Sequence, residues 1–78
     1  MTSQEIKSAV DAVCSMAGDF EKVTIRVAGV QTTVKMAEFV RLVQRNKMFD
    51  SDRMLLIIDH GTDCFIAGYS SVESINLS

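Results

Sequence analysis

The stretch that decides the fold is Val23-Thr24-Ile25-Arg26-Val27-Ala28-Gly29-Val30-Gln31-Thr32-Thr33-Val34. Apolar and polar residues alternate on both sides of Ala28-Gly29, which is the pattern of a half-buried strand. Ala28-Gly29 has the composition of a tight turn, so residues 23–27 and 30–34 are predicted to be the two strands of a hairpin. A hairpin cannot bury its own apolar face well, so the flanking segments must cover it.

The segment before the hairpin is predicted to be an amphipathic helix from about Ser3 to Ala17. Thr2 and Glu5 have the spacing of a capping box, in which each side chain accepts a hydrogen bond from the other residue's backbone. Apolar residues then recur at helical spacing. Gly18 follows them where a left-handed C-cap is expected.

The segment after the hairpin is predicted to be a second amphipathic helix, from about Met36 to Asn46. Its apolar residues Met36, Phe39, Val40 and Val43 stand at positions i, i+3, i+4 and i+7. This spacing places them on one face of a helix.

The C-terminal third is predicted to consist of strands. The continuous apolar run Met54–Ile58 is typical of a strand covered on both faces. A turn over residues 59–63 leads to a returning strand, Cys64–Tyr69, and Ile75 with Leu77 suggests a short last strand.

We therefore expect one α+β domain over residues 1–78. Its order is α-β-β-α-β-β(-β), with two helices packed on one face of a four- or five-stranded, mainly antiparallel sheet. The chain has no proline, and no low-complexity stretch divides it.

Length, composition and charge also lead to expectations about self-association, location and the cysteines. The chain has 78 residues, 47% of them hydrophobic, and a net charge of −2. A core of this size supplies only about 3–5 kcal/mol of stability, so we expect self-association, as a homodimer. Glu5, Lys7 and Asp11 interrupt the apolar run that a signal peptide would need, so a cytoplasmic location is expected. Cys14 and Cys64 are interpreted as small buried hydrophobes.

No complete set of catalytic residues is evident. Cys64 and His60 flank one turn and are candidates for a nucleophile and its base, but no third orienting group is evident beyond Asp59 or Asp63.

A metal site is a second candidate, because Asp50, Asp52, Asp59, His60 and Asp63 lie in one stretch. Asp50-Ser51-Asp52 resembles the start of a calcium loop but lacks its glycine and closing glutamate. Zinc usually takes four Cys or His ligands, and the chain has three such residues. We therefore expect no enzyme activity, no metal and no cofactor.

Charge segregation is the most informative feature. Residues 35–47 hold four bases against one acid, Glu38, whereas the rest of the chain holds four bases against nine acids. We expect this basic helix face to contact another protein. The residues predicted to bind the partner are Lys35, Arg41, Gln44, Arg45, Lys47, Met48 and Phe49.

The apolar, strand-edge side of the C-terminal half is a second candidate surface for a partner. Two alternatives to the interpretation of the basic face also stay open. One is an ordinary solvated helix face, with cations near the helix C-terminus. The other is a nucleic-acid-binding protein that uses the same face, although such proteins usually have a larger basic excess and exposed aromatic residues.

A non-catalytic regulator, adaptor or stoichiometric inhibitor fits these features best. In size and character the chain resembles the small accessory proteins of bacteriophages, including inhibitors of host defence. That resemblance concerns length, acidity and the lack of catalytic motifs, and it assigns no site residues.

Overall fold

The computed structural model describes residues 1–61 and 63–78, apart from the side chain of His60. The elements are α1 (Ser3–Ser15), β1 (Lys22–Val27), β2 (Val30–Lys35), α2 (Met36–Gln44), β3 (Phe49–Asp50), β4 (Leu55–His60), β5 (Asp63–Gly68), the 3-10 turn η1 (Tyr69–Ser71) and β6 (Val72–Leu77). The predicted α+β class and the two predicted helices are confirmed. In the described residues, neither helix has the length and apolar character needed to cross a membrane.

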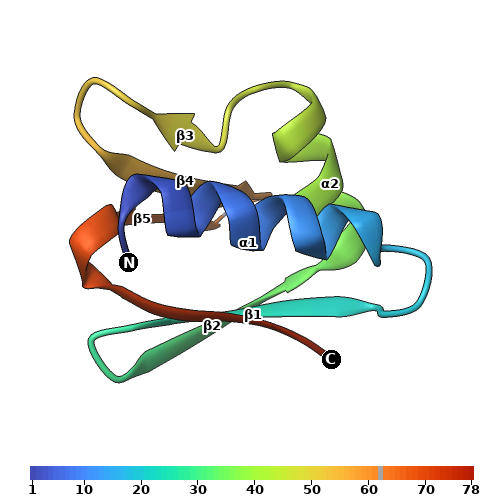
Figure 1. Cartoon of the computed structure of the whole chain (residues 1–78). Coiled ribbons are helices and arrows are strands. Elements are labelled where there is room, and N and C mark those ends of the chain that lie inside the picture. The colour runs from blue at the N-terminus through green and yellow to red at the C-terminus, as the bar shows by residue number, and fades with distance from the viewer. Residues whose placement is uncertain (62) are drawn as a thin grey trace.

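The strands form two small antiparallel sheets, which corrects the prediction of one sheet with both helices on one face. The first sheet has the order β2-β1-β6 and the second the order β3-β4-β5. Figure 1 shows the first sheet below α1. The two sheets are separate because η1 turns the chain after β5, so that β6 returns to pair with β1.

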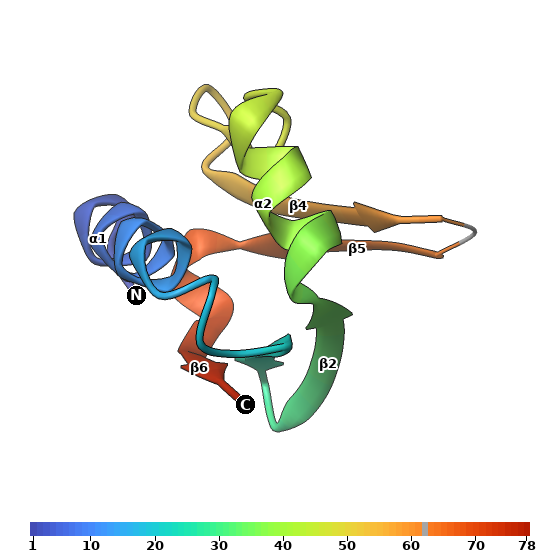
Figure 2. The ribbon, with the colours of Figure 1, turned by 90° about the vertical axis from the view of Figure 1, so that its right-hand side faces the viewer.

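The core lies between the two helices and the two sheets. α2 packs on β4 as well as on β1 and β2, while α1 packs on β6. Figure 2 shows α2 running from the end of β2 across β4 and β5, whose hairpin projects beyond the helix. The largest fully buried side chains are Phe39, Ile6, Ile25, Met48, Leu56, Ile58, Val10, Val23 and Val34.

The β1–β2 hairpin is confirmed, and its turn fixes its register. Ala28 and Gly29 both have positive φ, 49° and 82°. This is the backbone of a two-residue turn whose twist matches that of the flanking strands. Val27 therefore pairs with Val30, and counting back from the turn places Lys22 opposite Lys35.

The outer side of the first sheet is polar. The hydroxyl oxygens of Thr24 and Thr33 lie 3.3 Å apart across the strands. Glu73 on β6 accepts a hydrogen bond from the Gly29 N–H at 2.8 Å and pairs with Arg26 at 3.4 Å. This face of the sheet is therefore the solvent-facing one.

The capping box of α1 is present as predicted. Thr2 accepts from the Glu5 N–H at 3.2 Å, and Glu5 accepts from the Thr2 N–H at 2.9 Å. The helix ends at Ser15 with Met16 as its C-cap, and Gly18 has no positive φ, so the predicted glycine cap is wrong.

Replacing Ala28 by asparagine is expected to raise the free energy of unfolding by about 0.5–1 kcal/mol, because asparagine tolerates the left-handed conformation better than alanine. Ala28→Val at the same exposed site should lower it, since a β-branched residue tolerates positive φ least. Urea unfolding of the two variants checks this. Shifts in the same direction would contradict the assigned turn.

The hydrogen bond from the Thr2 backbone lowers the pKa of Glu5, and the Thr2 hydroxyl contributes further. A lowered folded-state pKa gives stabilisation that is present above the unfolded-state pKa and is lost as the pH falls through the folded-state pKa. Glu5→Gln keeps an acceptor for the Thr2 N–H but does not titrate. Its urea midpoint should therefore fall less steeply than that of the wild type on acidification through this range. Parallel curves would contradict the role of Glu5.

Candidate functional site

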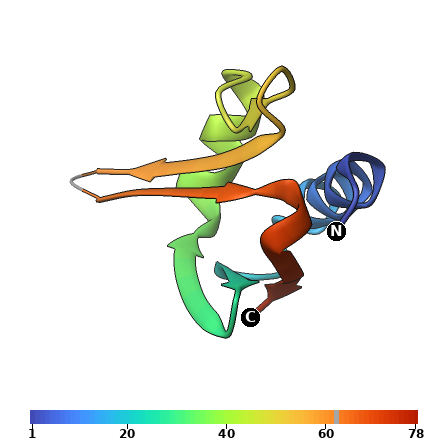
Figure 3. The same ribbon diagram turned by 90° about the vertical axis from the view of Figure 1, so that its left-hand side faces the viewer.

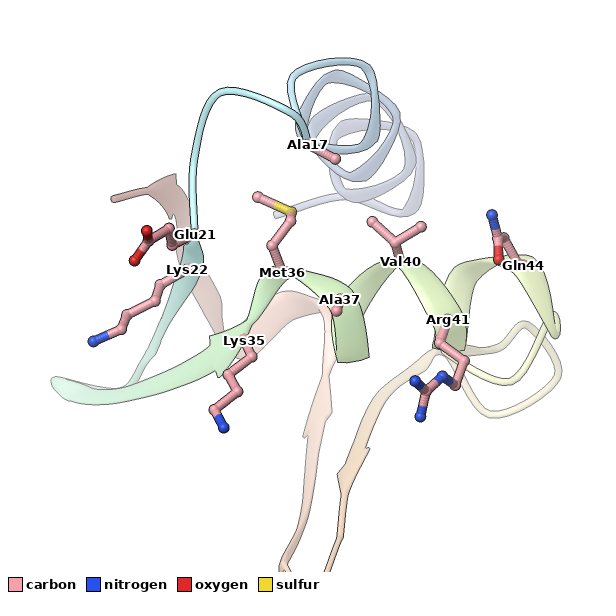
Figure 4. A pocket seen from close by; sticks show the side chains of 9 residues that line it. All are labelled: Ala17, Glu21, Lys22, Lys35, Met36, Ala37, Val40, Arg41 and Gln44. Carbon is pink, nitrogen blue, oxygen red and sulfur yellow. The ribbon is translucent and has the colours of Figure 1, made fainter.

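A groove of about 730 Å³ lies where the end of α1, the start of β1 and α2 meet (Figure 4). The Met36 N–H donates to the Glu21 carbonyl at 2.8 Å, so α2 begins directly beside the start of β1. The groove is lined by Ala17, Glu21, Lys22, Lys35, Met36, Ala37, Val40, Arg41 and Gln44.

One wall of this groove is apolar. Figure 4 shows Met36 and Val40 pointing from α2 toward the end of α1, where Ala17 lies. Met36 is almost fully buried, Val40 and Ala17 are half-buried, and Ala37 is exposed. Apolar side chains left partly open to water can be covered by an apolar group of a ligand or partner.

The other wall is cationic. Figure 4 shows Lys22, Lys35 and Arg41 pointing to the side away from α1. Lys22 and Lys35 are direct cross-strand partners, and like charges in that position destabilise a sheet. Lys35 is also the N-cap of α2, where the positive end of the helix dipole disfavours a cation. Both lysines therefore stand in positions that cost stability.

No carboxylate in residues 1–61 and 63–78 lies within 4 Å of either lysine amine. The ion pairs in this part of the chain are Arg26–Glu73 and Arg53–Asp50. Glu21 lines the same groove but does not neutralise the lysines at that distance. The cationic wall is thus available to an anion from outside the chain.

A second, smaller hollow of about 300 Å³ lies between α2 and the tip of the β4–β5 hairpin. It is lined by Glu38, Arg41, Leu42, Arg45, Lys47, Asp59 and Gly61. Arg41 belongs to both hollows. The predicted basic face is therefore divided: Lys35, Arg41 and Gln44 line the groove, while Arg41, Arg45 and Lys47 line the smaller hollow.

Met48 and Phe49, also predicted as partner contacts, lie elsewhere. Met48 is fully buried, so it presents no side-chain surface to a partner. Phe49 is half-buried and packs edge-to-face on Tyr69, with ring centroids 6.4 Å apart. Both turn inward because the chain reverses after Asn46, whose φ is 56°, and returns as β3.

The groove is also lined by Lys22, Glu21 and Ala17, which were not predicted as site residues from the sequence. A signal for Lys22 was present, because a two-residue turn at Ala28-Gly29 pairs residues whose numbers add to 57. That sum places Lys22 opposite Lys35. No comparable signal placed the end of α1 beside α2.

The side chain of His60 lies outside the described residues, so the His60–Cys64 hypothesis is not addressed by the structure. Both cysteines are free; Cys64 is exposed, which corrects the expectation that it is buried, and Cys14 is half-buried. Burial raises the pKa of the Cys14 thiol, and Asp11 raises it further.

The acids considered for a metal site lie in two places, with Asp50 and Asp52 at and after β3, and Asp59 and Asp63 near the tip of the β4–β5 hairpin. Asp50 accepts a hydrogen bond from the Arg53 N–H at 3.1 Å and thereby closes the turn before β4. Within the described chain, no three His, Cys, Asp or Glu residues are grouped as metal ligands.

Comparisons with protein-family models, curated proteins and solved structures found no match to this chain.

Lys35→Glu is expected to raise the free energy of unfolding by about 0.5 kcal/mol, because it converts a like-charged cross-strand pair into an attractive one. Lys22→Glu should have a similar effect. The double variant, which places two acids opposite each other, should lose most of the gain. Urea unfolding at low salt measures all three. A destabilised Lys35→Glu protein would contradict the unfavourable placement of Lys35.

Proposed function

We propose that this protein is a non-catalytic binding module, acting as a regulator, adaptor or stoichiometric inhibitor of another protein. We propose further that the groove beside α2 receives an acidic, partly apolar segment of that partner. The observation that carries the proposal is the juxtaposition of Lys22 and Lys35 at the start of α2.

The two lysines affect both the stability of the chain and its binding of an anion. Two lysines that lower the stability of the isolated chain gain favourable interactions when a carboxylate binds between them. A charge-assisted hydrogen bond to a carboxylate is stronger than a neutral one. Arg41, on the same wall, offers a planar set of donors that a carboxylate can accept in pairs.

The apolar wall restricts the kind of anion. An amphipathic helix presents apolar residues on one side and charged residues on the other, and such helices bind in grooves of this type. Its apolar side would cover the half-buried Ala17 and Val40. Its carboxylates would face Lys22, Lys35 and Arg41.

Nucleic acid is the second candidate, because Arg41 joins the groove to the hollow that contains Arg45 and Lys47. A phosphate backbone could follow that line of cations. The protein segment is preferred for two reasons. The chain has a net charge of −2, and the groove is lined by aliphatic rather than aromatic side chains, whereas single-stranded nucleic acid binds best where its bases stack.

The test uses a labelled 15-residue amphipathic peptide with leucine on one side and glutamate on the other. Fluorescence anisotropy is expected to show binding to the wild type, and at least about tenfold weaker binding to Lys35→Glu and to Lys22→Glu, since each removes a contact worth about 1.4 kcal/mol or more. Because both variants should be more stable than the wild type, unfolding would not explain their loss of binding.

Arg53→Glu is the matched control, since Arg53 is a highly exposed cation that lines neither hollow. It should bind the peptide as the wild type does. Equal binding of a peptide with glutamine in place of glutamate would contradict the cationic wall. Tighter binding of a 15-nucleotide single strand, falling steeply with salt and abolished by Arg41→Glu with Arg45→Glu, would favour the nucleic-acid alternative.

A further inference from the structure

The groove beside α2 has an acid at the end where the helix begins. Among the described residues that line the groove, this acid is Glu21 and there is no other. The Glu21 carbonyl accepts the Met36 N–H at 2.8 Å, and the Glu21 N–H donates to the Ser78 carbonyl at 3.2 Å. The backbone of Glu21 is thus held on both sides, while its side chain is exposed. A negative charge therefore marks the start of the groove.

The charge changes along the groove from that end to the other. Lys22 and Lys35 follow Glu21 as a cross-strand pair. Arg41 comes six residues after Lys35, and the uncharged Gln44 is the last residue of α2. At 1.5 Å per residue, Lys35 and Gln44 are about 13 Å apart along the helix. Figure 4 shows Glu21 at one end of the groove and Gln44 at the other. The two ends therefore differ in charge.

A neighbouring hollow of about 360 Å³ extends the acidic end. It is lined by Asp19, Phe20, Glu21, Lys22 and Ser78, so a second acid lies beside Glu21. In residues 1–61 and 63–78, the acids that form ion pairs are Glu73 and Asp50. No described base therefore lies within 4 Å of the Asp19 or Glu21 carboxylate. A base from a partner would be attracted to this end of the groove, whereas an acid would be repelled.

The side of α2 that forms the groove is open. In Figure 2 the end of α1, the start of β1 and α2 face the viewer. Figure 3, from the opposite side, shows the β4–β5 hairpin in front of α2, so the hairpin does not cover the groove. The outer face of this hairpin is open too. Ile66, the cross-strand partner of Ile57, is 57% exposed, which corrects the expectation that the Met54–Ile58 run is covered on both faces.

We propose that the groove holds a helical segment of a partner in one direction, antiparallel to α2, with a basic residue near the segment's C-terminal end beside Glu21. This inference rests on the function proposed above, because it concerns the same groove. The acids of the segment face Lys22, Lys35 and Arg41, and its N-terminal end lies toward Gln44. The partner is then recognised by the order of its charges as well as by their number.

Helix dipoles select between the two possible directions. α2 begins next to Lys35, so the positive end of its dipole lies at that end of the groove. An antiparallel segment places the negative end of its own dipole there, where α2 and the two lysines attract it. A base in the last turn of the segment is attracted both by its own dipole and by Glu21. The dipoles and the order of side-chain charges therefore favour the same direction.

A double-mutant cycle tests the contact with Glu21. The probe is the 15-residue leucine and glutamate peptide with capped ends, carrying either lysine or glutamine at its last position. The wild type is expected to bind the lysine peptide about two- to fivefold more tightly, which is the range for an exposed ion pair. Glu21→Gln should bind both peptides equally. Glu21→Lys should bind the lysine peptide less tightly than the glutamine peptide, so the preference is reversed.

Glu38→Gln is the matched control, because Glu38 is an acid in the first turn of α2 that lines the smaller hollow and not the groove. It should keep the wild-type preference, and circular dichroism should show that each variant keeps its fold. A second pair of peptides, with lysine or glutamine at the first position, tests the direction. The first and last positions of this helix are about 21 Å apart, so the wild type should bind the second pair equally.

Three results would overturn the inference and leave the proposed function in place, provided that Lys35→Glu still weakens peptide binding. They are the same preference in the wild type and in Glu21→Gln, a preference at the first position instead of the last, and no preference at either position. If Lys35→Glu binds the peptide as the wild type does, the proposed function fails and the inference fails with it.

Discussion

The turn at Ala28-Gly29 is the constraint on which the rest of the structure depends. Its two left-handed residues set the register of β1 against β2. A shift of one residue would move every side chain of a strand to the other face. The observed register sends Val23 and Ile25 into the core and brings Lys22 and Lys35 together. It also places the end of β2 where α2 can begin beside β1. The packing of the core and the charge of the groove therefore have the same origin.

The features that the sequence predicted are those determined within a few residues. The capping box of Thr2 and Glu5 and the hairpin depend on near neighbours, and both are present. The division into two sheets depends on β6 pairing with a strand about 50 residues earlier, for which no local pattern exists. Met48 stands between a lysine and a phenylalanine, and only the reversal after Asn46 buries it. Within the candidate site, the basic residues of α2 could be identified from the sequence. The apolar wall could not be predicted, because it forms only where the end of α1 packs beside α2.

The pairing of β6 with β1 also has a consequence for how the chain acquires its structure during synthesis. Val23 is joined to Leu77, so β1 gains its second neighbour only after more than fifty further residues have left the ribosome. Until then, the future centre of the first sheet has an open edge, and the core lacks Val72. Contacts between residues so far apart slow folding, because the intervening loop must close first. The hairpin and helices can form as they emerge, but the first sheet is complete only once β6 has also emerged.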